Sequence, residues 1–160
     1  MKRIVRIGLA AACSLVVASA IAQNAPPTPE QQAQTAVDQR QAAFKLLAWN
    51  MGPLGGMARN RVPFDAAVVK VRAERIAQLA AMIDDLYGPD TTAFADLKTE
   101  SLPGIWKSKD AFHGKAMDLA NAATALATVA ATGDQGETVK AIGGVGKACG
   151  SCHDDYRAEH

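Results

Sequence analysis

The chain has 160 residues, of which 49% are hydrophobic, 5% aromatic and 21% charged. This composition fits one soluble domain and excludes a disordered or collagen-like chain, and the abundance of Ala and Leu beside few aromatic residues favours helices over a β-sandwich or barrel. Because 17 basic residues nearly balance 16 acidic ones, giving a formal net charge of +1, we expect no nucleic-acid partner.

The N-terminal segment has the layout of a secretory signal peptide. Basic residues precede an apolar run over residues 7–21 that ends in small side chains, which predicts cleavage after Ala22. The run is shorter than the ~20 residues that a membrane-spanning helix needs, so a transmembrane anchor is the less favoured interpretation. We therefore expect a signal peptide over residues 1–22 and an exported domain over residues 23–160, with no membrane insertion once the signal is removed.

A first helix is predicted after a Pro-rich entry. Thr28 can cap it, with Pro29 at its first position and Gln31 placed to complete a capping box. Apolar residues recur at the spacing of an amphipathic helix up to about Asn50. The Gly and Pro residues at 52–56 then predict a break in the chain.

The second predicted helix begins near residues 63–65 and ends at the Gly-Pro pair 88–89. An irregular connection follows over residues 88–107. Because this connection becomes apolar towards its end, we expect it to turn Trp106 inward.

Two more amphipathic helices complete the chain. Ser108 is the predicted N-cap of the third, which ends at Gly133, and Asp134 caps the fourth, with Glu137 in its first turn. Four amphipathic helices of about 20 residues each predict an all-α fold, an antiparallel four-helix bundle.

The last helix carries the chemistry. Without the signal peptide, Cys149 and Cys152 are the only cysteines, and with His153 they form a C-x-x-C-H motif, the attachment signature of a c-type haem. Thiols one helical turn apart share a face of the helix and can each add across a haem vinyl group, while the neighbouring imidazole can reach the iron. The motif predicts one haem c per chain, and its attachment beyond the bacterial inner membrane suits a periplasmic protein.

Three other interpretations of the cysteine pair are less favoured. A redox C-x-x-C usually starts a helix in an α/β domain, and no strand pattern occurs here. Zinc needs a tetrahedral set of protein ligands, and only His113 and His160 remain as nitrogen donors, at unconvincing spacings; His113 is interpreted as a partly exposed bystander. A structural disulfide over so short a spacing would be strained and would close almost no loop.

These features together resemble cytochrome c prime, the class II c-type cytochromes. The similarity covers essentially the whole mature chain. Class I cytochromes c instead carry the motif near the N-terminus with an axial Met downstream, whereas here no Met follows the motif. The matching positions are Arg40 and Phe44 in the first helix, residues 103–106 before the third, and Cys149, Cys152, His153, Tyr156 and Arg157 in the fourth.

The resemblance implies a haem buried between the helices, with His153 as the iron ligand. Relatives with Met four residues after the first-helix Arg are six-coordinate, low-spin electron carriers, whereas those with an apolar or aromatic residue there are usually five-coordinate and bind small gases. Here that residue is Phe44, which offers iron no lone pair, so we expect a five-coordinate, high-spin iron. Met51 is the main rival ligand, and on pattern alone Phe44 could be an ordinary core residue.

Further cofactor-binding candidates follow from the same resemblance. Arg40 is placed to neutralise a haem propionate. Trp106 and Tyr156 are expected to pack near the macrocycle. Arg157, one turn after His153, could reach the proximal haem edge or a bound gas molecule, or it could be a solvated terminal residue.

Two function classes remain. The first is a haem protein that binds nitric oxide, and also carbon monoxide, for trapping, detoxification or sensing. The second is an electron-transfer cytochrome with a redox partner protein, in its alternative form six-coordinate with a Met sixth ligand. An enzyme is least favoured because nothing supplies an obvious distal acid or base. The resemblance also implies a homodimer through the first two helices.

Overall fold

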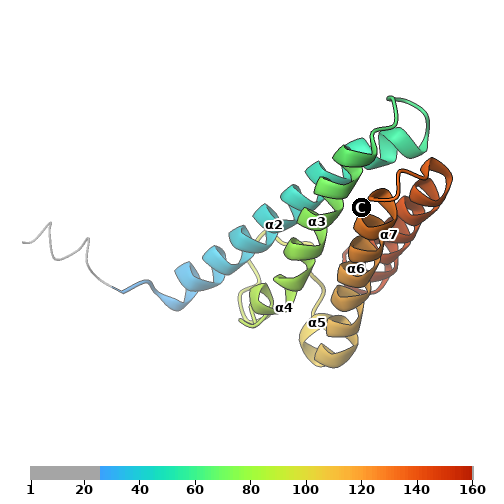
Figure 1. Ribbon diagram of the computed structural model, residues 1–160. Coiled ribbons are helices and arrows are strands. Elements are labelled where there is room, and N and C mark those ends of the chain that lie inside the picture. The colour runs from blue at the N-terminus through green and yellow to red at the C-terminus, as the bar shows by residue number, and fades with distance from the viewer. Residues whose placement is uncertain (1–25, 160) are drawn as a thin grey trace, which may run out of the picture. The chain divides into compact units, whose positions relative to one another are not determined.

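The computed structural model describes residues 26–159 (Figure 1). The predicted signal peptide over residues 1–22 and its cleavage site lie outside this range. No helix among the described residues has the length and apolar character that crossing a membrane requires.

The described part of the chain is helical. From Ala33 onward it forms one compact unit, in which α3 packs on α6 and α6 packs on α7 (Figure 1). The four long helices form an antiparallel bundle, which confirms the predicted all-α fold, and the one β-type pairing found within residues 26–159 is an isolated bridge between Ser101 and Arg157. The helices are α2 (Pro29–Ala58), α3 (Ala66–Ala81), α4 (Ile83–Leu86), α5 (Gly104–Lys107), α6 (Lys109–Ala130) and α7 (Gln135–Tyr156).

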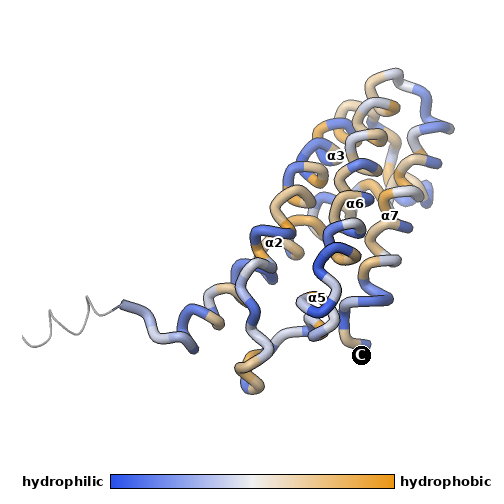
Figure 2. The backbone as a smooth tube through the Cα atoms, turned by 90° about the horizontal axis from the view of Figure 1, so that it is seen from below, coloured by the Kyte–Doolittle hydropathy of each residue, from blue (hydrophilic) through white to orange (hydrophobic). Residues whose placement is uncertain are grey.

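The long helices turn apolar residues towards one another. Figure 2 shows hydrophobic and hydrophilic positions alternating along α3, α6 and α7, as in amphipathic helices. Leu54 of α2, Ile76 of α3, Leu126 of α6 and Ile142 of α7 are each at most 2% exposed. Burying an aliphatic side chain of this size contributes about 1.5–3 kcal/mol, so packing between all four helices stabilises the bundle.

The first helix is longer than predicted. We expected the Gly and Pro residues at 52–56 to end it, but α2 continues through Pro53 to Ala58. Proline has no N–H to donate to the carbonyl one turn earlier, which here belongs to Trp49. Arg72 of α3 supplies a donor instead, because its Nη1 donates to the Trp49 carbonyl over 3.1 Å. The prediction of a break was wrong because a side chain from another helix satisfies the freed carbonyl.

The backbone turns left-handed two residues after the end of α2. Asn60 has a φ of 54°, a conformation that Asn adopts more readily than most residues. The N–H of Arg61 donates to the Gly56 carbonyl over 2.9 Å. This pair of features is typical of a helix C-terminus, so the sequence does hold a stop signal, about two turns after the predicted end near Asn50.

Two predicted helix starts are confirmed. In the segment before Ala33, the N–H of Thr28 donates to Gln31 Oε1 over 2.8 Å, and the N–H of Gln31 donates to Thr28 Oγ1 over 3.3 Å, which is the predicted capping box. At the start of α7, the Asp134 carboxylate accepts the N–H of Glu137 over 2.9 Å. Both caps follow from residues close together in the sequence.

The other helix boundaries lie near their predicted positions, but not every residue there makes a capping hydrogen bond. Asp65 caps α3 by accepting the N–H of Val68 over 3.0 Å. Ser108 precedes α6 as predicted, but its side chain makes no capping hydrogen bond. Gly133 has a φ of 79°, the left-handed conformation that glycine adopts without steric cost, and it separates α6 from α7.

The connection after α4 lies beside the end of α7. The second predicted helix is divided at Met82 into α3 and α4. Further on, the N–H of Leu102 donates to the Tyr156 carbonyl over 3.0 Å, and the N–H of Ala158 donates to the Glu100 carbonyl over 2.8 Å. The end of the helix that carries the C-x-x-C-H motif is therefore anchored by backbone hydrogen bonds.

Candidate functional site

The last two turns of α7 carry the motif residues. Cys149, Cys152 and His153 are half-buried, and neither cysteine forms a disulfide. Burial raises the pKa of Cys149 and raises that of Cys152 to about 11. Burial, and then the charge of Arg157, lower the pKa of His153. These shifts favour neutral thiols before haem attachment and a neutral imidazole, the form of histidine that binds metals.

These side chains open onto a cavity of about 840 Å³. It is bounded by α2, α3, α6 and α7 together with the connection that follows α4. Trp106 is the one predicted site residue that does not line it. The predicted residues that do are Arg40, Phe44, Cys149, Cys152, His153, Tyr156 and Arg157.

Arg40 ties the cavity wall to the chain after α4. Its side chain is 2% exposed, and burial lowers its pKa. Nε donates to the Leu86 carbonyl over 2.8 Å, Nη1 donates to Thr91 Oγ1 over 2.9 Å, and Nη2 donates to the Pro89 carbonyl over 2.5 Å. Each nitrogen of the guanidinium thus has a protein partner. Pairing of Arg40 with a haem propionate stays a prediction, and it would have to use the remaining N–H groups of the guanidinium.

An aromatic cluster forms part of the wall. Tyr87 is its centre, with ring centroids 6.4 Å from Phe44, 4.9 Å from Phe112 and 5.8 Å from Trp106. Phe112 continues the cluster to Tyr156 at 5.2 Å. Trp106 is half-buried, so the expected inward turn is partial, and it contacts the cavity wall through Tyr87.

The Trp106 indole also fixes the same connection as Arg40. Its Nε1 donates to the carbonyls of Tyr87 and Pro89 over 3.0 and 3.2 Å, and the Arg40 guanidinium lies 5.1 Å from its ring centroid. Trp106 therefore acts on the cavity by holding Tyr87 and Arg40.

Arg157 is partly exposed at the end of α7. Its N–H donates to the His153 carbonyl over 3.0 Å and its Nε lies 3.9 Å from Glu100 Oε2. The side chain lines the cavity but is 49% exposed. Both predicted readings of Arg157, at the haem edge or in solvent, are compatible with this position.

Of the two residues considered as other metal ligands, Met51 lines the cavity and His113 does not. Met51 of α2 is half-buried and lines the cavity. His113 is 57% exposed, outside the cavity, and pairs with Asp84, as its interpretation as a bystander requires. Within residues 26–159, no group of three or more His, Cys, Asp or Glu side chains is arranged to hold a metal ion.

Several lining residues were missed by the sequence interpretation. Tyr87 centres the aromatic cluster, and its presence in a chain so poor in aromatic residues was a usable signal. Lys45 and Lys98 bring positive charge to the cavity, and Lys115 contacts the motif itself through Ser151. No local pattern marks these lysines, because their positions depend on helix packing.

The cavity and its donors fit a haem. Its volume lies within the range of about 300–1,000 Å³ typical of ligand and cofactor sites. Two thiols and an imidazole project from one helix, Phe44 and Leu47 give part of the wall an apolar surface, and Lys45 supplies charge that suits a propionate carboxylate.

A sequence model of one protein family, described as Cytochrome C', matches residues 35–157. The chain belongs to the cytochrome c' family. The family implies covalently bound haem c, in agreement with the C-x-x-C-H motif, so this chain is a haem c protein.

Individual cytochromes match along most of their length. Cytochrome c' of Cereibacter sphaeroides is 38% identical over 128 residues, which cover 79% of this chain and 85% of that protein. Cytochrome c-554 of the same organism is 35% identical over 150 residues, covering 93% and 94%.

Two solved structures bear on ligands and assembly. A cytochrome c' with an unusual ligand-controlled dimer dissociation has a TM-score of 0.72 and 34% identity, and the match covers 84% of this chain and 100% of that one. A nitric oxide complex of a mutant cytochrome c prime from Alcaligenes xylosoxidans has a TM-score of 0.70 and 30% identity, covering 79% and 97%.

Proposed function

We propose that this cytochrome c' is a periplasmic haem protein whose iron has His153 as its one protein ligand and binds small gases, chiefly nitric oxide and also carbon monoxide. Cys149 and Cys152 hold the haem covalently. Bound haem supplies an iron that accepts a neutral diatomic ligand and changes between two oxidation states. The observation that carries the proposal is Phe44, a residue without a donor atom, in the cavity wall four residues after Arg40.

His153 is suited to be the ligand. It follows the second cysteine directly, so covalent attachment would keep imidazole and haem in one register. Its lowered pKa favours the neutral imidazole, which keeps a lone pair free for iron.

Phe44 is suited to hinder the opposite side. It packs against Tyr87 with ring centroids 6.4 Å apart, so a ligand that displaces its ring loses packing contacts before any bond to iron forms. Carbon monoxide should therefore bind slowly, while nitric oxide bonds to ferrous haem strongly enough to offset this cost. The nitric oxide complex of a related cytochrome c prime supports the same ligand class here.

A second candidate function is electron transfer through a six-coordinate, low-spin iron. The observation that favours it is Met51, which carries a thioether and lines the same cavity. A redox partner protein would also be compatible with the five-coordinate form, because electron transfer requires only that the iron change oxidation state.

Export and a non-enzymatic role belong to the same proposal. The signal-peptide pattern over residues 1–22 supports a periplasmic location for the domain from residue 23 onward. His153 is the one histidine among the described residues that line the cavity, and because it is assigned to iron, no cavity histidine is left for acid or base catalysis.

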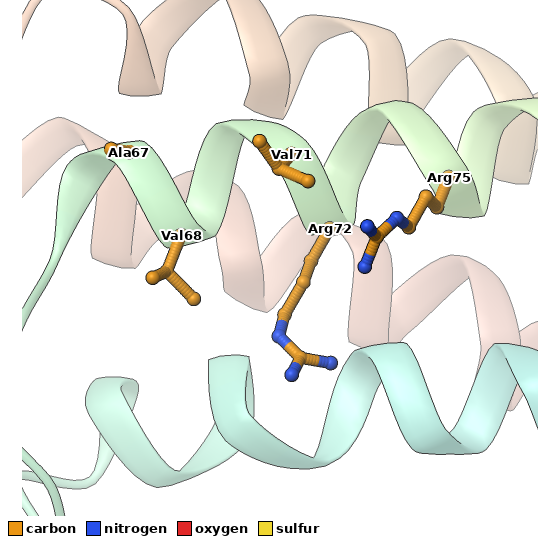
Figure 3. A pocket seen from close by; sticks show the side chains of 5 residues that line it. All are labelled: Ala67, Val68, Val71, Arg72 and Arg75. Atoms are coloured by element: carbon orange, nitrogen blue, oxygen red, sulfur yellow. The ribbon is translucent and has the colours of Figure 1, made fainter.

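We further propose a homodimer through α2 and α3. Leu46 and Trp49 of α2 are 50% and 57% exposed, and Val71 of α3 is 43% exposed. Beside them a shallow hollow of about 330 Å³ is lined by α3, including Arg72 and Arg75. Figure 3 shows Arg72 extending from α3 towards α2. Large exposed apolar side chains next to arginines are typical of protein interfaces, and the dimeric relative supports the assignment.

The test of the gas-binding proposal is carbon monoxide association with the reduced holoprotein. Phe44→Ala should accelerate association by about tenfold or more, since removing ~1.4 kcal/mol of barrier gives tenfold, and should change nitric oxide affinity less. Met51→Leu is the matched control, because it alters the rival residue and keeps Phe44. Equal rates for wild type and Phe44→Ala would mean that Phe44 is only core, and acceleration by Met51→Leu instead would identify Met51 as the sixth ligand.

A further inference from the structure

Lys115 joins α6 to the haem-attachment segment of α7. Its Nζ donates to Ser151 Oγ over 2.6 Å and to the Ser151 carbonyl over 3.2 Å. The same nitrogen lies 2.9 Å from Asp155 Oδ2. Ser151 stands between the two cysteines and Asp155 stands two residues after His153, so the contacts of Lys115 bracket the turn that carries the imidazole.

The far end of the same turn is held by the backbone. The Tyr156 carbonyl accepts the N–H of Leu102 over 3.0 Å, and the N–H of Ala158 donates to the Glu100 carbonyl over 2.8 Å. Helix ends ordinarily fray because their last carbonyls lack partners within the helix. Here Lys115 and the connection hold the final turn from two sides, although α7 ends only three residues after His153.

We propose that Lys115 is a positioning residue that holds the His153 turn in place and so sets how readily His153 leaves the iron when nitric oxide binds on the opposite side. This inference rests on the proposed function. In the step concerned, a bond forms between nitric oxide and iron, and the bond between iron and the imidazole nitrogen breaks, with its electron pair staying on the nitrogen. No net oxidation occurs, and no further reactant is needed.

The physical reason is the cost of moving the turn. Hydrogen bonds from a charged donor to a carboxylate and a hydroxyl are stronger than those between neutral groups, and Lys115 is only 27% exposed. While these bonds persist, a released imidazole stays close to the iron and rebinds. Without them the turn moves more freely, and release becomes faster and more complete.

α3 provides a matched control. Lys70 and Glu74 form an ion pair with an N–O distance of 2.6 Å, and neither residue lines the cavity. Lys70→Met removes a comparable surface pair without touching α7, whereas Lys115→Met removes the contacts to Ser151 and Asp155 and keeps an unbranched side chain of similar length.

The experiment measures two properties of the holoprotein. Stopped-flow absorption gives the rate at which the six-coordinate nitrosyl converts to the five-coordinate form that has lost His153, and resonance Raman gives the iron–histidine stretching frequency of the reduced protein. We expect Lys115→Met to convert about three- to tenfold faster and to shift the stretch to lower frequency. Lys115→Arg should stay close to wild type, Ser151→Ala and Asp155→Asn should each give part of the effect, and Lys70→Met should give none.

The outcomes separate this inference from the function on which it rests. Unchanged rate and frequency in Lys115→Met, or the same change in Lys70→Met, would overturn the role of Lys115. If Lys115→Met does not fold, Ser151→Ala and Asp155→Asn decide the question by the same criteria. If wild type forms no nitrosyl complex, the gas-binding proposal fails, and the Raman frequency alone decides whether Lys115 holds the His153 turn.

Discussion

Arg40 and Phe44 are one helical turn apart on α2, and they connect the cavity to the segment of chain that follows α4. The guanidinium of Arg40 satisfies the carbonyls of Leu86 and Pro89, while Phe44 lines the cavity beside Tyr87. Because both residues project from one face of α2, the position of Phe44 depends on the same contacts that order the connection. In the proposed function, the residue at position 44 determines whether α2 offers the iron a donor atom or a bulky ring.

Removing the thiols tests the attachment. Cys149→Ala or Cys152→Ala should each leave one thioether and a less stable holoprotein, and the double variant should retain no covalent haem, because these are the only cysteines outside the predicted signal peptide. Mass spectrometry of the denatured proteins measures the bound haem. Covalent haem in the denatured double variant would show that the motif has been misread.

At the scale of single helices, the features that depend on neighbouring residues could be predicted from the sequence, whereas contacts between residues distant in the sequence could not. The capping box at Thr28 and the cap at Asp134 depend on neighbouring residues, and the C-x-x-C-H motif lies within five consecutive residues of α7. The continuation of α2 through Pro53 depends on Arg72, which is distant in sequence. The contact of Lys115 with Ser151 likewise arises only when α6 packs on α7, so no sequence pattern reveals it.

The hydrogen bond across Pro53 gives a prediction for α2. Arg72→Met should lower the free energy of unfolding by about 1 kcal/mol, since the Trp49 carbonyl loses its donor. Arg75→Met is the control, because Arg75 also lies over the Trp49 ring, at 5.9 Å, and should cost less. In a Pro53→Ala background the restored N–H should reduce the effect of Arg72→Met. Thermal unfolding of wild type, Arg72→Met, Pro53→Ala and the double variant measures the coupling, and equal costs of Arg72→Met in both backgrounds would contradict this explanation of the helix.

At the scale of the whole molecule, the bundle encloses the cavity, and its outer face carries the proposed dimer contact. Within the unit that starts at Ala33, all four long helices contribute to the cavity wall. α2 contributes to both the cavity and the proposed dimer contact, because Phe44 lines the cavity while Leu46 and Trp49 are exposed. A ligand that displaces Phe44 therefore acts on the same helix as the proposed dimer contact.

Trp49→Asp tests the dimer. Placing a carboxylate in a mainly apolar interface carries a large desolvation cost, so this variant should sediment as a monomer at concentrations where wild type is dimeric. Met117→Asp is the control, because Met117 is also exposed, at 41%, but lies on α6. A monomeric wild type, or equal dissociation by both variants, would rule out an interface centred on α2 and α3.

The most direct test of the central claim is the resonance Raman spectrum of the reduced holoprotein, recorded with and without carbon monoxide. With His153 as the one protein ligand and Phe44 as a barrier without a donor atom, the spectrum without gas should show a five-coordinate, high-spin iron. Carbon monoxide should convert it slowly to a six-coordinate, low-spin form. A six-coordinate, low-spin spectrum before any gas is added would contradict the claim and would indicate a second protein ligand, with Met51 as the first candidate.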